Sequence, residues 1–221
     1  MTYVVTAGPT REHLDPVRFL SNPSTGKMGF AVAARAARRG HKVILIAGPV
    51  SLKTPQNVTR VDVVSARDML QAVCAAIEGI AADERIVFVS TAAVADFRPA
   101  ERAGEKLKKH QMSHAIELVP NPDILKSVHA RFLEGDTPRQ LSLIGFAAET
   151  NRVCEEAARK CREKHLKFIV ANDVTEKGSG FGTSTNRVTF VFPSGKMRSF
   201  PQMSKAAVAT RIVNEAEKGL A

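Results

Sequence analysis

Residues 3–8, YVVTAG, form a short apolar run that ends in small residues, and the next regular pattern is helical, over about residues 27–39. The same order returns in KVILIAG at 42–48, in a helical pattern at 66–78 and in IVFVSTAA at 86–93. Strands rich in Val and Ile with little polar alternation are typical of a parallel sheet that helices cover on both faces. We therefore predict an α/β fold: a Rossmann-like, doubly wound and mostly parallel sheet.

The second half of the chain continues this alternation and then adds a hairpin. LIGFAAET (143–150) and KFIVANDV (167–174) flank a charged helical pattern over about 151–164. RVTFVFPSGKMRSF (187–200) predicts a hairpin that turns at PSGK, because Pro, Ser and Gly favour tight turns. A C-terminal helix is expected over about 203–218.

The chain length of 221 residues suits a single domain over residues 1–221. Two segments interrupt the alternation of strands and helices. Residues 97–114 carry many charges and no sustained apolar period, so we predict a mobile loop there. Residues 178–186, GSGFGTSTN, lead into the hairpin and together with it make a separate region over about 178–201.

Composition narrows the class of partner and the compartment. Lys and Arg outnumber Asp and Glu by 32 to 22, a net charge of +10, but the basic residues form short clusters and there is one Tyr and no Trp. This favours phosphorylated metabolites over nucleic acid. Because no run of eighteen apolar residues, no signal-peptide pattern and no CxxC pair occurs, we expect a soluble cytoplasmic protein without a membrane partner.

Small or polar residues follow four of the predicted strands. They are TAGPTRE (6–12), AGPVS (47–51), TAAVADF (91–97) and GFAAET (145–150). In open parallel sheets ligands bind beyond the carboxyl ends of the strands, where the strand order reverses. These four loops are therefore predicted to converge on one crevice.

The stretch SNPSTGKMGF, residues 21–30, precedes the first helix with small residues. Ser24, Thr25 and Gly26 fit a phosphate or carboxylate seat at the helix N-terminus, and Ser24 or Thr25 equally fits an ordinary helix cap. A P-loop is excluded because Ser and Met stand at 21 and 28, where Gly and Ser or Thr are needed. GxGxxG is also absent after the first strand.

Other polar residues have a functional and an ordinary interpretation. Asn22 can donate to an oxyanion or form a turn, and Asp96 can bind ribose or a base amino group or cap a loop. Lys106, Lys108 and Lys109 can close over a polyphosphate or remain solvated.

The last helical pattern before KFIVANDV offers a second pair of lysines. Lys160 and Lys164 lie four residues apart and can hold phosphate together, although Glu156 is also spaced for an ion pair with Lys160. His110 and His114 share this spacing but lack a third ligand, so no metal site is assigned and the identity of metal ligands stays unknown.

Taken in order, seven motifs resemble phosphopantothenoylcysteine synthetase, or phosphopantothenate–cysteine ligase, of the bacterial CTP-dependent type. They are TAGPTREHLDPVRFLSNPSTGKMG, AGPVSL, AAVADFRP, EKLKK, NPDIL, GFAAET and ANDV, and the resemblance spans residues 2 to about 215. It implies ligation of 4'-phosphopantothenate to L-cysteine through an acyl-cytidylate, with CTP and Mg²⁺, in coenzyme A biosynthesis. The family usually forms the synthetase half of a bifunctional flavoprotein, so a fused or separate flavin-dependent decarboxylase is an expected partner.

The resemblance also implies roles for single residues. Asn22 and Lys106 match the catalytic positions, with Asn22 stabilising the acyl-cytidylate and Lys106 leading a KxKK flap that includes Lys108 and Lys109. The positions that match nucleotide contacts are Ser90, Thr91, Ala92, Asp96, Lys106, Val119, Pro120, Asn121, Pro122, Phe146, Lys160 and Lys164.

A homodimer is implied as well, with the region at 178–201 building much of the contact. Three alternatives stay open at this point. An ATP-using ligase of the same family differs only in base recognition, and a nucleotide-binding Rossmann module would bind without turnover. A nicotinamide-dependent oxidoreductase is disfavoured, since GxGxxG and a Tyr-xxx-Lys pair are missing.

Overall fold

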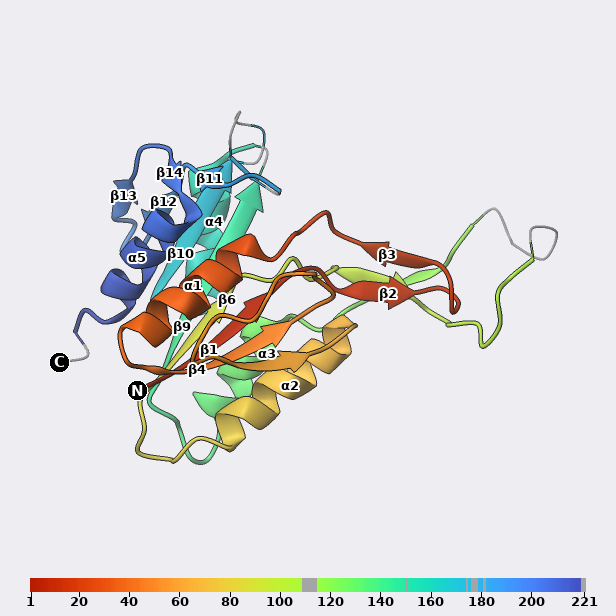
Figure 1. The fold of residues 1–221 in the computed structure, drawn as a ribbon, viewed down its shortest axis with the longest axis horizontal. Helices are drawn as coiled ribbons and strands as arrows, with labels where there is room; N and C mark the ends of the chain where they lie inside the picture. The colour runs from red at the N-terminus through yellow and green to blue at the C-terminus, as the bar shows by residue number, and fades with distance from the viewer. Residues whose placement is uncertain (109–114, 150, 174, 176–178, 181, 220–221) are drawn as a thin grey trace.

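The computed structural model describes the chain except for residues 109–114, 150, 174, 176–178, 181 and 220–221 (Figure 1). Its main element is an eight-stranded sheet in the order β13-β12-β10-β9-β6-β1-β4-β5. Six parallel strands form its body: β1 (Thr2–Ala7), β4 (Lys42–Ala47), β5 (Thr59–Asp62), β6 (Ile86–Ser90), β9 (Leu141–Glu149) and β10 (Phe168–Asp173). Numbered by their order along the chain, these six strands lie across the sheet in the order 3-2-1-4-5-6, which is the doubly wound Rossmann arrangement. The predicted fold class is confirmed.

Helices cover both faces of this sheet. Helices α1 (Lys27–Arg38) and α5 (Lys205–Ala216) pack together on one face. The other face carries α2 (Ala66–Glu78), α3 (Ile124–Phe132) and α4 (Val153–Glu163). The helices predicted over 66–78 and 151–164 are thus confirmed to within two residues at each end.

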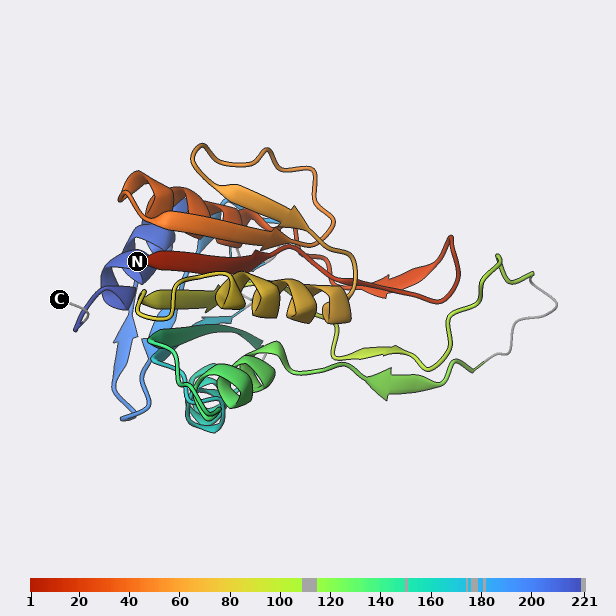
Figure 2. The same ribbon diagram turned by 90° about the horizontal axis from the view of Figure 1, so that it is seen from below.

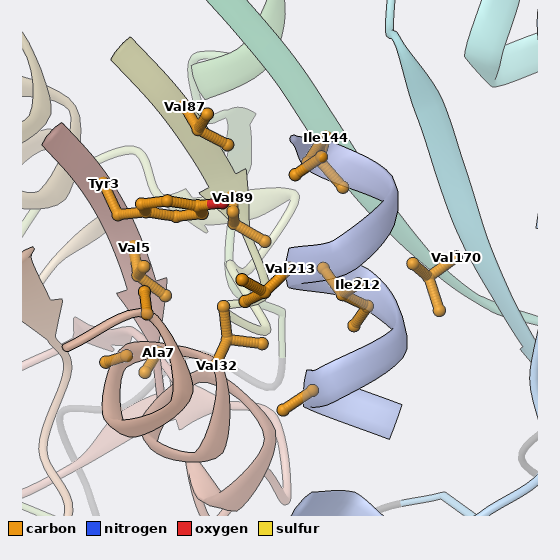
Figure 3. Packing of buried hydrophobic residues seen from close by; sticks show 14 of the residues in the cluster. Tyr3, Val5, Ala7, Val32, Val87, Val89, Ile144, Val170, Ile212 and Val213 are labelled. Carbon is orange, nitrogen blue, oxygen red and sulfur yellow. The ribbon is translucent and has the colours of Figure 1, made fainter. Parts of the chain in front are cut away.

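The core is divided into two layers by the alternation of side chains along the strands. In β1, Tyr3, Val5 and Ala7 contribute to the layer under α1 and α5, whereas Val4 contributes to the opposite layer. Figure 3 shows β1 side chains facing Val32 of α1, with Ile212 and Val213 of α5 beside them. Because every residue of β1 is buried, this strand lies at the centre of the molecule.

The predicted hairpin is confirmed as an extension of the sheet. Strands β12 (Thr189–Val191) and β13 (Met197–Ser199) pair in antiparallel fashion, and β12 pairs with β10. The turn lies at PSGK, where Gly195 has φ 83. A small pair, β11 (Thr185–Asn186) with β14 (Met203–Ser204), lies next to α5.

An arm extends from the carboxyl edge of the sheet in both views (Figures 1 and 2). It consists of the hairpin β2 (Arg11–His13) with β3 (Phe19–Ser21) and the pair β7 (Phe97–Pro99) with β8 (Leu118–Pro120). The expectation of a loop over 97–114 is therefore wrong at its start, because Phe97 and Arg98 pair with Pro120 and Val119. The sequence shows little period here because each of these strands has only three residues.

Within the part of the chain that the structure describes, none of the helices is long and apolar enough to cross a membrane.

Candidate active site

Two cavities open side by side beyond the carboxyl ends of β1, β6, β9 and β10. The large cavity has a volume of about 380 Å³ and the small cavity about 110 Å³. Ala92, Ala93, Phe146 and Ala148 line both, so they form a shared ridge between the two. The strand order reverses between β1 and β6, and the bridge between Pro9 and Ala93 marks this point, which is where the sequence predicted the crevice.

Most of the predicted nucleotide contacts line the large cavity. They are Ser90, Ala92, Asp96, Asn121, Pro122, Phe146, Lys160 and Lys164, and Asn22 lies there too. They come from β6 and its following loop, from the connection between β8 and α3, from β9 and from the end of α4. Residues more than 140 positions apart in the sequence therefore share one surface.

Asn22 is held against the loop that follows β6. Its Nδ2 donates to the carbonyl oxygens of Ala93 at 3.1 Å and Val94 at 3.2 Å. Ser21, just before it, donates from Oγ to the carbonyl of Thr10 at 2.7 Å. The side-chain amide of Asn22 is thus fixed beside the shared ridge, on the side of the large cavity.

Asp96 is positioned through its backbone. Its carbonyl accepts from the backbone N–H of Asn121 at 2.8 Å, and Asn121 Nδ2 donates to the carbonyl of Ala95 at 2.8 Å. These bonds join the loop after β6 to the segment before α3. The carboxylate of Asp96 therefore has a fixed place in the wall of the large cavity.

The lysines of α4 contribute positive charge to the same cavity. Lys164 Nζ lies 2.8 Å from Oδ2 of Asp123, whose Oδ1 accepts from the backbone N–H of Lys126 and caps α3. Glu156 pairs with Arg159 at 2.8 Å. The hydrogen bond and charge of Arg159, and then the charge of Lys160, lower the pKa of the Glu156 carboxyl. A phosphate entering the cavity would compete with Asp123 for Lys164.

The small cavity lies at the start of α1. Ser24, Thr25 and Gly26 line it, as the proposed seat requires, but no side chain caps the helix. The expectation that Ser24 or Thr25 caps α1 is therefore wrong: the N-cap is Gly26 with φ 76, and Ser24 Oγ accepts from the Gly26 N–H at 3.3 Å. The first turn of α1 keeps its backbone donors available to a ligand.

Gly29 allows this helix start to approach the sheet closely. A Cβ at this position would lie 2.5 Å from Cβ of Ala7, 2.9 Å from the carbonyl oxygen of Thr6 and closer still to Oγ1 of Thr91. Thr91 Oγ1 in turn donates to the carbonyl of Thr6 at 2.6 Å. The seat therefore depends on the missing side chain of Gly29.

Some predicted site residues lie elsewhere. Thr91 lines the small cavity, and Val119 and Pro120 belong to β8 without lining either cavity. Lys106 and Lys108 are exposed on the segment beyond β7, and Lys109, His110 and His114 fall outside the described residues. Backbone groups tie this segment to the arm: Ala103 N–H donates to the carbonyl of Leu14 at 2.8 Å, and Leu107 accepts from Arg18 Nη2 at 2.7 Å and donates to Asp15 Oδ2 at 3.2 Å.

Five polar residues of the site escaped the sequence analysis. Lys27, Lys205, Asn172 and Asn186 line the small cavity, and Asp123 lines the large one. Asp123 and Asn172 carried a signal, since each lies in a quoted motif, NPDIL and ANDV. Lys205 had none, because it begins a helix nearly two hundred residues after the first strand.

Among the described residues, one group can offer three metal ligands within 4.8 Å of one another: His129, Glu134 and His165. None of these three residues lines either cavity, although His165 directly follows Lys164 of the large cavity. The large cavity offers the carboxylates of Asp96 and Asp123. Such oxygens together with substrate phosphates are the ligands that Mg²⁺ takes in proteins.

Comparison with known proteins places the chain in one protein family. Residues 1–220 match the family model described as the DNA/pantothenate metabolism flavoprotein C-terminal domain. The chain is 46% identical over 214 residues to the coenzyme A biosynthesis bifunctional protein CoaBC of Vibrio vulnificus (strain YJ016), covering 96% of this chain and 51% of that protein. To the protein of the same name from Bacillus subtilis (strain 168) it is 45% identical over 213 residues, covering 96% and 50%. The chain thus spans about half the length of the curated relatives it matches.

Solved structures agree in fold. The crystal structure of the C-terminal domain of CoaBC superposes with a TM-score of 0.78 at 41% identity, covering 99% of this chain and 95% of that one. A Cab2 mutant in complex with phosphopantothenate-cysteine gives a TM-score of 0.76 at 15% identity, covering 98% and 86%. At that identity the likeness concerns the fold alone.

Proposed function

The chain belongs to the family of DNA/pantothenate metabolism flavoprotein C-terminal domains, and on this premise we propose that it ligates 4'-phosphopantothenate to L-cysteine in coenzyme A biosynthesis. The observation that carries the proposal is the large cavity. It gathers Asn22, Asp96, Phe146, Lys160 and Lys164 at the switch point of a doubly wound sheet. This is the set of side chains that a nucleotide and an activated acid require.

The first half-reaction activates the acid. A carboxylate oxygen of phosphopantothenate attacks the α-phosphorus of CTP, the bond to the bridging oxygen breaks, and pyrophosphate leaves with the electron pair. Both reactants are anionic, so cations must offset their repulsion. Lys160 and Lys164 supply fixed positive charge in the large cavity. Mg²⁺ between Asp96, Asp123 and the phosphates would add a Lewis acid there.

The second half-reaction forms the amide. The cysteine nitrogen adds to the acyl carbon, the carbon–oxygen bond to the phosphate breaks, and CMP leaves, while the amine gives up one proton. Negative charge grows on the carbonyl oxygen as the nitrogen adds. Asn22 at the ridge is placed to donate to that oxygen if its amide leaves Ala93 and Val94.

CTP is proposed over ATP because the matched relatives are bacterial and the cavity volume of about 380 Å³ lies within the roughly 300–1,000 Å³ of small-molecule sites. The base would stack beside Phe146 and be read by backbone groups of Asn121 and Pro122. We propose a cytoplasmic location. We also propose that a flavin-dependent decarboxylase, fused or separate, consumes the product, as the bifunctional names of the relatives suggest.

We further propose a homodimer, with the arm as its contact. Exposed apolar side chains gather on the arm: Val17, Phe19, Phe97, Ile116 and Leu118. The region at 178–201 was the expected contact, but its strands β12 and β13 continue the central sheet and Met197 is its exposed large apolar residue. A second copy seated on the arm would bury several apolar side chains that the monomer leaves in water.

The test is pyrophosphate release from CTP, with ATP in parallel, in the presence of Mg²⁺ and 4'-phosphopantothenate, with and without cysteine. Release that requires phosphopantothenate and prefers CTP supports the proposal. Preference for ATP would select the ATP-using ligase. Tight nucleotide binding without any release would support the module without turnover.

A further inference from the structure

The small cavity remains unused by the first half-reaction as proposed. At about 110 Å³ it is well below the roughly 300–1,000 Å³ of sites for nucleotide-sized ligands. It adjoins the large cavity along the shared ridge of Ala92, Ala93, Phe146 and Ala148. Its size fits one small molecule, which would approach the reacting carbonyl from across the ridge, on the side away from the large cavity.

A buried lysine lines this cavity. Lys205 is the first residue of α5, is 8% exposed, and donates from Nζ to the carbonyl oxygen of Gly180 at 3.1 Å. Burial lowers the pKa of its ammonium, and the charge of Lys27 lowers it further. A buried ammonium costs free energy unless an opposite charge accompanies it.

The second positive group is Lys27, at the first position of α1. It lines the same cavity and donates to the carbonyl of Gly182 at 2.8 Å. Among the described residues, no carboxylate lies within ion-pair distance of Lys27 or Lys205. With the uncapped N-terminus of α1 beside them, these ammonium groups make a small, strongly positive cavity.

Asn172 adds a feature of the opposite kind. It lies in β10 opposite Ala148, lines the small cavity and is 7% exposed. Its Oδ1 is buried with no hydrogen-bond partner. The neighbouring Asn186, by contrast, accepts with Oδ1 from the N–H of Gly180 at 3.1 Å. A buried acceptor without a donor calls for an N–H or O–H group from a ligand.

We infer that the small cavity binds the amino acid substrate, with its carboxylate between Lys205, Lys27 and the start of α1 and its amine donating to Asn172. The inference rests on the proposed ligase function and deepens it. An α-amino acid carries one anionic group and one N–H donor, which matches the two cations and the lone acceptor. A fully ionised phosphate has no donor for Asn172, and a metal ion has no negative charge for the two lysines.

This placement orders the second half-reaction. With its carboxylate anchored in the small cavity, the amine lies toward the ridge, beyond which the acyl-cytidylate occupies the large cavity. After losing one proton to solvent the amine keeps two N–H bonds, so it can donate to Asn172 while its lone pair adds to the acyl carbon. The carbon–oxygen bond to phosphate then breaks, CMP leaves with that electron pair, and the nitrogen gives up a second proton to solvent as the amide forms.

The experiment compares cysteine with cysteamine, which lacks the carboxylate, as acceptors of the acyl group. We expect the protein to prefer cysteine in kcat/KM, and Lys205→Met to reduce this preference about tenfold or more, the loss of a charge-assisted bond. Lys27→Met, at an exposed position, should reduce it in the same direction but less. Lys167→Met is the matched control. Lys167 is a half-buried lysine that also donates only to backbone carbonyls, those of Ala216 and Lys218, far from the cavity.

Pyrophosphate release without any acceptor is measured on each variant and reports the first half-reaction separately. A preference for cysteine that is unchanged in both Lys205→Met and Lys27→Met would overturn the inference while leaving the ligase function intact. A larger loss in acceptor-free pyrophosphate release than in cysteine preference would also overturn it, by assigning the cavity to CTP or the acid. No pyrophosphate release from the unmodified protein would instead contradict the proposed function. If Lys205→Met fails to fold, Lys27→Met decides.

Discussion

The body of the molecule buries its apolar side chains, whereas the arm leaves several of them exposed. In the body, β1 buries every residue, and the two layers of the core leave Tyr3 and Phe88 with no exposed surface. In the arm, Phe97 of the three-residue strand β7 is 53% exposed, and Val17, in the turn between β2 and β3, is 56% exposed. The body is stable through its own core, whereas the arm needs either polar anchors or a partner.

The site residues divide along the same line. Both cavities lie at the carboxyl edge of the body. Asn22 follows β3, where the chain returns from the arm, and lines the large cavity. Lys106, in contrast, lies on the arm side, tied through Leu107 to Asp15 and Arg18. Under the proposed function, the body therefore holds the reacting groups of the two cavities in place, and the arm supplies Lys106, which must be brought to them.

The largest effect is expected at the ridge. Asn22→Asp replaces an amide donor by an acceptor at the acyl carbon, so amide formation should fall about 100- to 1,000-fold while pyrophosphate release changes less. Rapid quench of the two half-reactions, with detection of accumulated acyl-cytidylate, measures this difference. The exposed loop residue variant Asn57→Asp is the control. Equal loss in both half-reactions would remove the specific role of Asn22.

On the arm, Phe97→Asp should break the dimer. Placing a charge in an apolar contact costs about 2 kcal/mol or more, or about thirtyfold in the dissociation constant. Analytical ultracentrifugation over a concentration series measures it, with Val61→Asp, an exposed apolar position of the body, as control. A dimer that survives Phe97→Asp but dissociates with Met197→Asp would move the contact to the hairpin β12–β13.

In the body, Gly29→Ala should destabilise the fold by about 1–3 kcal/mol, because the new methyl group overlaps Ala7 and Thr91. Urea unfolding gives the free energy of unfolding. Gly79→Ala, at the end of α2 with ordinary φ of −73, should change it far less. Similar stability of the two variants would mean that α1 can move away from β1 without cost.

Lys106→Gln tests how the arm serves the body. We expect pyrophosphate release to fall about tenfold through loss of one charge at the triphosphate, with little change for the exposed Lys53→Gln. An unchanged rate would take Lys106 out of the chemistry. Mixing Lys106→Gln with Asn22→Asp sharpens the comparison: recovered activity would place Lys106 at the cavity of the partner copy, and no recovery at its own.

The smallest effect concerns the anchor of the arm. Burial opposes ionisation of Asp15, but the side chain and N–H of Arg18 and the N–H groups of Val17 and Leu107 outweigh it and lower the pKa of this carboxyl. A lowered folded-state pKa means that the contribution is present above the unfolded value, about 3.9, and is lost as pH falls below it.

From about pH 4 downward, the arm amides of the unmodified protein should therefore exchange faster relative to their intrinsic rates, which means that their protection falls. Asp15→Asn should show faster exchange already at neutral pH and a flatter pH dependence. Asp62→Asn, at an exposed ion pair with Arg60, should leave the arm unchanged. An arm whose exchange follows the same pH profile in Asp15→Asn would mean that other groups hold it.

The sequence by itself determined the doubly wound body. Val- and Ile-rich runs, helical periods and the hairpin turn at PSGK are local signals, and burial makes five of the six body strands detectable from the sequence. The edge strand β5, which is largely exposed, was not predicted. Motif order also pointed to the family and to most residues of the large cavity. The arm escaped because a three-residue strand has no period to detect.

Only the tertiary structure decided which residues meet. Helix α1 has Gly26 as its N-cap, with no side-chain hydrogen bond, rather than Ser24 or Thr25, and Gly29 lets this helix approach β1 closely. Lys205 and Asn172 become neighbours of that helix start through the crossover of α5 and the register of β10. Whether a buried charge or an unpaired acceptor can bind a ligand depends on the groups around it, and those groups come from segments far apart in the chain.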